Sequence, residues 1–167
     1  MAKVFRISKL KWYNFWLRLS GIPNWFKEYQ SAKITFSIES RASSGTRFNL
    51  INLAYKRWPS FFPFVLPHEK DSVGIMFECM PNGIYRIMAY KIHNGVTHHF
   101  HLANTIQKNK FNCKASVYKD YVFFECENLL THKITGYKMS IPKKEFKSIT
   151  FPFNMGLDNN TILLGIY

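Results

Sequence analysis

The Asn94-Gly95 pair stands between two stretches that alternate apolar and polar residues, and it constrains the fold more than any other feature of the sequence. Asn-Gly favours a two-residue type I′ turn, in which both turn residues take a positive φ and join two antiparallel strands. We expect the more apolar face of this hairpin to face the core. The turn predicts Lys91 opposite His98, Ala89 opposite Phe100 and Ile87 opposite Leu102 on that face, and Ile92 opposite Thr97, Tyr90 opposite His99 and Met88 opposite His101 on the other.

A second turn upstream tests this register independently. Pro81-Asn82-Gly83 suits a three-residue loop, a type I turn followed by Gly83 in the left-handed conformation. A two-residue turn would instead move Phe77 to the face that carries His99. The two turns therefore agree in only one register. It pairs Cys79 with Tyr85, Phe77 with Ile87, and Ile75 with Ala89 on the core face.

A third hairpin is predicted around Lys119-Asp120. It places Lys114 opposite Glu125, a favourable cross-strand charge pair. Its apolar face pairs Val117 with Val122, Ala115 with Phe124, and Cys113 with Cys126. The chain has three cysteines and no recognisable signal peptide, so we expect the facing cysteines to be buried free thiols in a reducing compartment.

The rest of the chain from residue 31 also follows the period of a β-strand. Ile34, Phe36 and Ile38 alternate with polar residues, and further strands are predicted over 133–140, 148–153 and 161–167. Sixteen Phe and nine Tyr fit pleated, half-buried surfaces. About ten strands with short connections predict an all-β fold, a two-sheet antiparallel β-sandwich of the jelly-roll type over residues 31–167.

Residues 1–30 differ in pattern and are predicted to be an N-terminal arm or flanking segment. Trp12, Phe15 and Trp16 recur at helical spacing, which indicates a basic amphipathic segment that docks on a partner. Residues 4–9 alternate instead, so a strand pair that lies against the sandwich remains the alternative.

The net charge of +13 indicates attraction to a polyanion: nucleic acid, an anionic membrane or an acidic partner. The basic residues are spread along the whole chain, so a solvated basic surface explains the charge equally well. Lys and Arg interrupt every apolar run before it reaches the length of a membrane span.

The order of motifs resembles that of the small concanavalin A-like (laminin-G-like) jelly-roll proteins of gut bacteria and their tailed phages. The matching segments are 71–77, Asn82-Gly83, 85–90, Asn94-Gly95, 110–114, 121–123, 151–156 and 159–161. Those relatives read aromatic-Pro-Tyr-Phe-Gly-Gly and then Ala-Pro near the end; here Phe151-Pro152-Phe153 is kept, the paired glycines are reduced to Gly156, and Ala-Pro is missing. The resemblance implies two curved antiparallel sheets and a role in glycan binding or in a phage particle.

The sequence carries no recognised catalytic motif. The Glu-x-Asp-x-x-Glu strand motif of hydrolases that resemble this fold is missing, and so are Gly-x-Ser-x-Gly, the P-loop and the dinucleotide fingerprint. His99 and His101 share one face, but two ligands fall short of a metal site. We therefore expect no enzyme, no cofactor and no metal.

The face that carries Tyr90 is the candidate binding surface. Exposed aromatic rings stack on sugars, and polar neighbours bind hydroxyl groups, so the predicted ligand-binding residues are Arg86, Tyr90, His99, His101 and Trp58. Packing of this face against the N-terminal segment or another subunit is the competing interpretation.

The first functional hypothesis is a non-catalytic structural or adhesion subunit of a phage particle, located in the virion or the host cytoplasm. Its partners would be other virion or assembly proteins, or glycans, and it would work as an oligomer or assembly subunit. The alternatives are a carbohydrate-binding module and a basic nucleic-acid-binding protein.

Overall fold

The computed structural model describes residues 3–7, 31–54, 71–141, 148–150, 153–154 and 162–167. These ranges are built from β-strands and contain no helix. In chain order the strands are β1 (Lys3–Ile7), β2 (Ser31–Ile38), β3 (Arg47–Ala54), β4 (Ser72–Cys79), β5 (Tyr85–His93), β6 (Val96–Thr105), β7 (Lys110–Val117), β8 (Tyr121–Asn128), β9 (Lys133–Ser140), β10 (Ser148–Thr150), β11 (Phe153–Asn154) and β12 (Ile162–Ile166).

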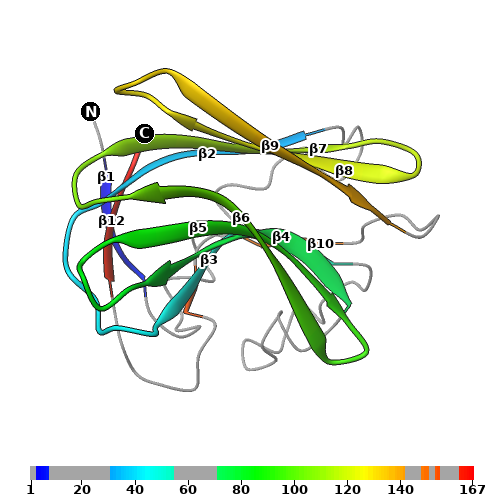
Figure 1. Ribbon diagram of the computed structural model, residues 1–167, viewed down its shortest axis with the longest axis horizontal. Coiled ribbons are helices and arrows are strands. Elements are labelled where there is room, and N and C mark those ends of the chain that lie inside the picture. Colours follow the sequence, from blue (N-terminus) through cyan, green and yellow to red (C-terminus); the bar gives the residue numbers. More distant parts are fainter. Residues whose placement is uncertain (1–2, 8–30, 55–70, 142–147, 151–152, 155–161) are drawn as a thin grey trace.

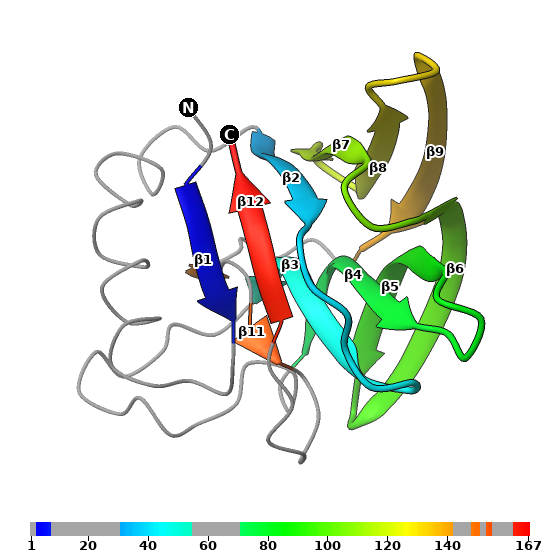
Figure 2. The same ribbon diagram turned by 90° about the vertical axis from the view of Figure 1, so that its left-hand side faces the viewer.

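The strands form two antiparallel sheets that pack face to face (Figure 1). The first sheet has the order β1-β12-β2-β7-β8-β9, and Figure 2 shows β1, β12 and β2 side by side in it. The second sheet has the order β10-β3-β4-β5-β6, and β11 also pairs with β3. This architecture confirms the predicted all-β, two-sheet jelly-roll sandwich.

The core lies between the inner faces of the two sheets and is rich in phenylalanine. Phe36 of the first sheet stacks on Phe77 of the second, with ring centroids 6.1 Å apart. Phe48 lies 5.3 Å from Phe77, and Phe111 lies 6.5 Å from Phe36. All four rings are buried. Aromatic pairs at these distances add to the stabilisation that comes from burying their area.

The glycine turns set the register of the second sheet as the sequence predicts. Asn94 and Gly95 have φ values of 49° and 77°, and Gly83 has a φ of 77°. Every predicted pair between β4 and β5 is confirmed, and so are the β5–β6 pairs from Ile92–Thr97 to Met88–His101. One predicted pair is wrong, because Ile87 lies opposite Ala103 and not opposite Leu102. A register shift between Ile87 and Met88 adds one residue to β6 at this point.

The third hairpin is confirmed in full, from Val117–Val122 to Cys113–Cys126. Both cysteines are free and buried, with their Sγ atoms 3.5 Å apart. The Lys114 Nζ atom lies 4.0 Å from Glu125 Oε2 on the outer face of the first sheet.

Within the strand predicted over 148–153, the described residues form β10 and β11, which keep the same register against β3. One expectation needs correction: the outer face of the second sheet, predicted to be exposed around Tyr90, is partly covered, because β4 is buried on both faces. Its outer face holds a small buried cluster of Met76, Met88, Tyr90 and Ile92.

Within the predicted N-terminal arm, the described residues are Lys3–Ile7. They form β1 and pair with β12, as the strand alternative anticipates for this stretch. Trp12, Phe15 and Trp16 lie outside the described residues, as does Trp58. Their predicted roles, and the domain boundary at residue 30, stay predictions.

Candidate functional site

A row of polar side chains crosses the outer face of the second sheet at one end. Arg47 of β3 lies opposite Glu78 of β4, Glu78 lies opposite Arg86 of β5, and Arg86 lies opposite Asn104 of β6. Successive side chains of a strand alternate between faces, and the residue next to Glu78, Phe77, points into the core. We call Arg47, Glu78, Arg86 and Asn104 the polar row.

Two guanidinium groups share one carboxylate in this row. Arg86 Nη2 donates to Glu78 Oε2 at 2.5 Å, and Arg47 Nε donates to Glu78 Oε1 at 3.3 Å. The side chain of Glu78 is 12% exposed, against 40% for Arg86 and 44% for Arg47. The carboxylate is therefore recessed while both cations reach solvent. With two positive charges and one negative charge, these three residues carry a net positive charge.

The two arginines keep Glu78 ionised. Burial alone raises the pKa of this carboxyl group, but the hydrogen bond from Arg86 and the charge of Arg47 outweigh burial and bring the pKa below its ordinary value. At neutral pH the polar row therefore combines a fixed carboxylate with two arginines whose positions it holds.

His99 lies close enough to the polar row to sense its charges. Burial lowers the pKa of this imidazole, and the positive charge of Arg47 lowers it further, while Glu78 acts in the opposite direction. His99 is therefore mainly neutral at neutral pH. Its Nε2 atom is enclosed and has no hydrogen-bond partner among the described residues. An unpaired ring nitrogen can accept or donate one hydrogen bond, and a bound molecule reaches this one when the side chains that enclose it move aside.

His101 and Asn104 extend the site toward the edge strand. His101 Nε2 lies 2.9 Å from Asn104 Oδ1, so the hydrogen bond places the proton on that ring nitrogen. Both side chains are exposed. The extra residue in β6 brings these two residues, three apart in sequence, onto the same outer face.

Tyr90 does not serve as the exposed aromatic platform that the sequence predicts. Its side chain is fully buried, its hydroxyl donates to Asn49 Oδ1 at 2.7 Å, and it accepts from Asn52 Nδ2 at 2.6 Å. Burial raises the pKa of this hydroxyl group far above its ordinary value. The ring fits because Gly74 lies beneath it, where a Cβ atom would come within 2.7 Å of the Tyr90 hydroxyl. Tyr90 thus stabilises the sheet below the site.

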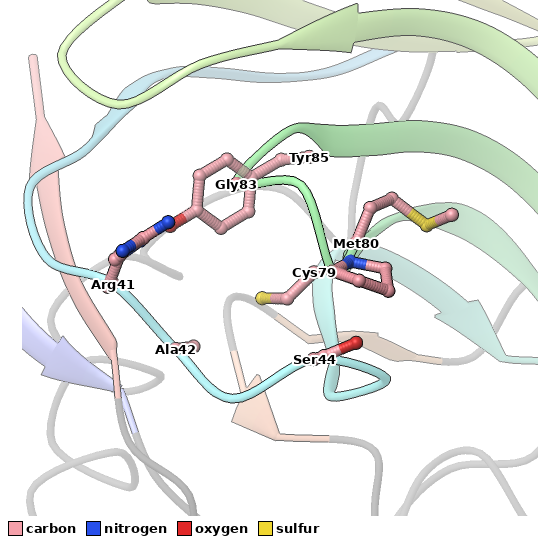
Figure 3. Close-up of a pocket in the computed structure, with 8 residues that line it drawn as sticks. Arg41, Ala42, Ser44, Cys79, Met80, Gly83 and Tyr85 are labelled. Atoms are coloured by element: carbon pink, nitrogen blue, oxygen red, sulfur yellow. The ribbon is translucent and has the colours of Figure 1, made fainter.

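A pocket of about 290 Å³ opens at the same end of the sheet (Figure 3). Cys79 and Tyr85 line it, and each is the sequence neighbour of a polar-row residue, so each points to the opposite face. Figure 3 shows Arg41 extending toward Tyr85 and Gly83. The Tyr85 hydroxyl donates to the Ser40 carbonyl at 3.4 Å, and burial raises its pKa. The pocket therefore offers one cation and a protonated phenol, separate from the polar row.

Of the predicted ligand residues, Arg86, His99 and His101 lie together on the outer face of the second sheet. Arg47 and Glu78 were missed. The predicted register already contained the signal for Glu78, because a turn that pairs Cys79 with Tyr85 must also place Glu78 opposite Arg86. The described part of the chain holds no group of three His, Cys, Asp or Glu side chains suited to a metal ion.

Comparison with known proteins gives fold-level relatives. No family model and no curated protein matches the chain. An alginate lyase from Klebsiella pneumoniae superposes with a TM-score of 0.56 and 8% identity, covering 82% of this chain and 57% of the lyase. The GH43 protein BlXynB from Bacillus licheniformis gives 0.53 and 14%, covering 84% of this chain and 27% of that one. A xylan beta-1,4-xylosidase from Bacillus halodurans gives 0.53 and 6%, covering 84% and 28%.

These relatives share the sandwich and correct the leading functional hypothesis. At such identities they establish the fold alone, and this chain spans 57% or less of each of the three. These fold relatives are enzymes, and they give no support to a non-catalytic subunit of a phage particle. That hypothesis is therefore withdrawn. The narrower resemblance to gut-bacterial and phage proteins stays a prediction.

Helices that could cross a membrane do not occur in the described ranges. The predicted virion or cytoplasmic location is not addressed by this observation and stays a prediction.

Proposed function

We propose that this protein is a carbohydrate-active domain that binds an acidic saccharide on the outer face of the second sheet. The observation that carries the proposal is the polar row, in which two half-exposed arginines share one recessed carboxylate. Within the described residues, the bonds to Glu78 use only Arg86 Nη2 and Arg47 Nε. Arg86 Nε is enclosed. The terminal N–H groups of the two guanidiniums that do not contact Glu78 are therefore the ones left for a ligand carboxylate, which arginine binds in a two-pronged geometry.

The neighbouring side chains suit the same ligand. His99, His101 and Asn104 add hydrogen-bonding groups, which a sugar needs for its hydroxyls and ring oxygen. The fold relatives support the choice of ligand class, since one is an alginate lyase and alginate is an acidic polysaccharide. The excess of 23 Lys and Arg over 10 Asp and Glu favours the approach of any anionic polymer.

The test is isothermal titration with an oligomer of uronic acids and with a neutral xylose oligomer of the same length. We expect the acidic oligomer to bind, and the neutral one to bind at least about tenfold more weakly. A tenfold difference in affinity corresponds to the free energy of about one charged hydrogen bond. Arg86→Gln should weaken acidic binding by about tenfold for the same reason. Lys133→Gln is the matched control, because it removes the same charge from an exposed strand position of the first sheet. Equal affinity for both oligomers, or equal losses in both variants, would reject the proposal.

His99 favours a second candidate function, cleavage of the bound saccharide by β-elimination. Once the side chains that enclose Nε2 move aside, the neutral His99 imidazole beside the arginines can take the proton from the carbon next to a uronate carboxylate, whose charge the arginines hold. The electron pair left on that carbon forms a carbon–carbon double bond, the glycosidic C–O bond on the next carbon breaks, and the protonated His99 returns its proton to the departing oxygen. The conjugated product absorbs in the ultraviolet. Loss of that absorbance in His99→Gln, with binding retained, is the expected result; no absorbance from the wild-type protein would exclude cleavage.

A further inference from the structure

A second pocket lies on the opposite side of the sandwich, between β2 and β7 of the first sheet. Its volume is about 350 Å³, and it is lined by Ser31, Lys114, Ser116, Val117 and Tyr118. Figure 1 shows β2, β7 and β8 in one layer and β3 to β6 in the other. Lys114 points outward, because its neighbours Cys113 and Ala115 are fully buried. We call this the serine–lysine pocket; it is independent of the polar row.

The register brings like groups face to face here. Ser31 lies directly opposite Ser116, and Lys33 lies directly opposite Lys114. Two ammonium groups at facing positions repel each other and cost stability unless an anion lies between them. Among the described residues, the nearest carboxylate to Lys114 is Glu125 at 4.0 Å, the outer limit of an ion pair. No described residue forms an ion pair with Lys33.

The serine hydroxyl groups of this pocket are also available to a ligand. Ser116 is only 7% exposed, yet no described residue forms a hydrogen bond to its hydroxyl. Two facing serines and Lys114 line one cavity, and Lys33 stands opposite Lys114 on the neighbouring strand, so the site is rich in hydrogen-bond donors. Such a set matches a tetrahedral oxyanion, which accepts several hydrogen bonds and carries the missing charge.

An aromatic wall stands beside this set. Tyr118 is 51% exposed and stacks on Tyr121 with ring centroids 4.6 Å apart. Tyr118 lines the cavity, and the stacking fixes its ring beside Tyr121. We propose that the serine–lysine pocket binds a phosphate or sulfate monoester, with the ester group on Lys114, Lys33 and the two serines and the body of the molecule against Tyr118.

The test is an amide NMR titration of the whole chain with four probes: inorganic phosphate, inorganic sulfate, a hexose monophosphate and a hexose monosulfate. We expect saturable shifts at Ser31, Lys114 and Ser116, with one of the esters binding more tightly than its inorganic ion. The ester that binds more tightly shows whether the site takes a phosphate or a sulfate group.

Two variants separate a specific site from net charge. Lys114→Gln should weaken ester binding by about tenfold, the value of a charged hydrogen bond. Lys133→Gln removes one charge from the same sheet outside the pocket and should change affinity by less than about twofold, as for an exposed charge. Equal losses in both variants, no saturation with any probe, or shifts confined to the polar row would overturn the proposal. Equal losses or no saturation would leave acidic-saccharide binding at the polar row untouched, whereas shifts confined to the polar row would place the anion there instead.

Discussion

Replacing Glu78 by Gln should weaken the fold and strengthen ligand binding at the same time. The substitution keeps the size of the side chain but removes the charge that holds Arg86 at 2.5 Å and Arg47 at 3.3 Å. Charged hydrogen bonds contribute most when both partners are buried, and here the arginines are 40% and 44% exposed. After this discount for solvent, we expect a loss of about 1 kcal/mol in the free energy of unfolding at neutral pH. For a chain of this size that lowers Tm by about 3 °C.

The pH dependence of the stability shows whether the charge of Glu78 stabilises the fold. The folded-state pKa of Glu78 lies below its ordinary value of 4.5, so its contribution is complete above that value and is lost as the pH falls through the folded pKa. The difference in Tm between the wild type and Glu78→Gln should therefore shrink below pH 4.5 and disappear in stronger acid. Calorimetry across this range measures it.

Binding should change in the opposite direction. Without the carboxylate, both guanidinium groups are free for the ligand, and affinity for an acidic oligosaccharide should rise by about fivefold, equivalent to about 1 kcal/mol. Glu125→Gln is the control, because its ion pair with Lys114 at 4.0 Å lies on the other sheet and should affect neither quantity. A variant as stable as the wild type, or one whose deficit persists in strong acid, would refute the charge-sharing geometry.

Further substitutions test the sheet beneath the site. Gly74→Ala would place a Cβ atom 2.0 Å from the Ile51 carbonyl oxygen, so β3 and β4 must separate, and we expect a loss of about 3 kcal/mol or more, measured by urea unfolding. Tyr90→Phe removes the bonds to Asn49 and Asn52 and leaves both amides unpaired, which should cost about 2 kcal/mol in the same assay. Gly95→Ala puts a side chain at a φ of 77° and should cost about 1 kcal/mol.

Control substitutions separate these effects from a general loss of stability. Gly136→Ala meets only the movable ring of Phe123, at 2.6 Å, and should cost less than Gly74→Ala. Tyr118→Phe alters an exposed hydroxyl and should be nearly neutral. If Tyr90→Phe were equally neutral, the buried amides must find other partners.

The sequence predicts the hairpins well because their turns carry their own chemistry. Asn94-Gly95 and Gly83 take the positive φ values that glycine and asparagine favour, and a turn of known length determines which residues face each other. The bulge that moves Ile87 from Leu102 to Ala103 leaves no such mark in the sequence.

The candidate site is predictable in part. Alternation places Arg86, His99 and His101 on one face, and the register adds Glu78. The burial of Tyr90 could not be predicted, since it depends on Asn49 and Asn52 in a strand that the sequence pattern did not reveal. A tyrosine on an outer face looks the same in the sequence whether solvent or polar side chains meet its hydroxyl.

The most direct test of acidic-saccharide recognition is to locate the ligand on the protein by amide NMR with a uronic-acid oligomer. We expect saturable shifts at Glu78, Arg86 and His99 on the outer face of the second sheet, and none of similar size for the neutral xylose oligomer. Shifts that appear only at the first sheet, or equal shifts with both oligomers, would contradict binding at the polar row.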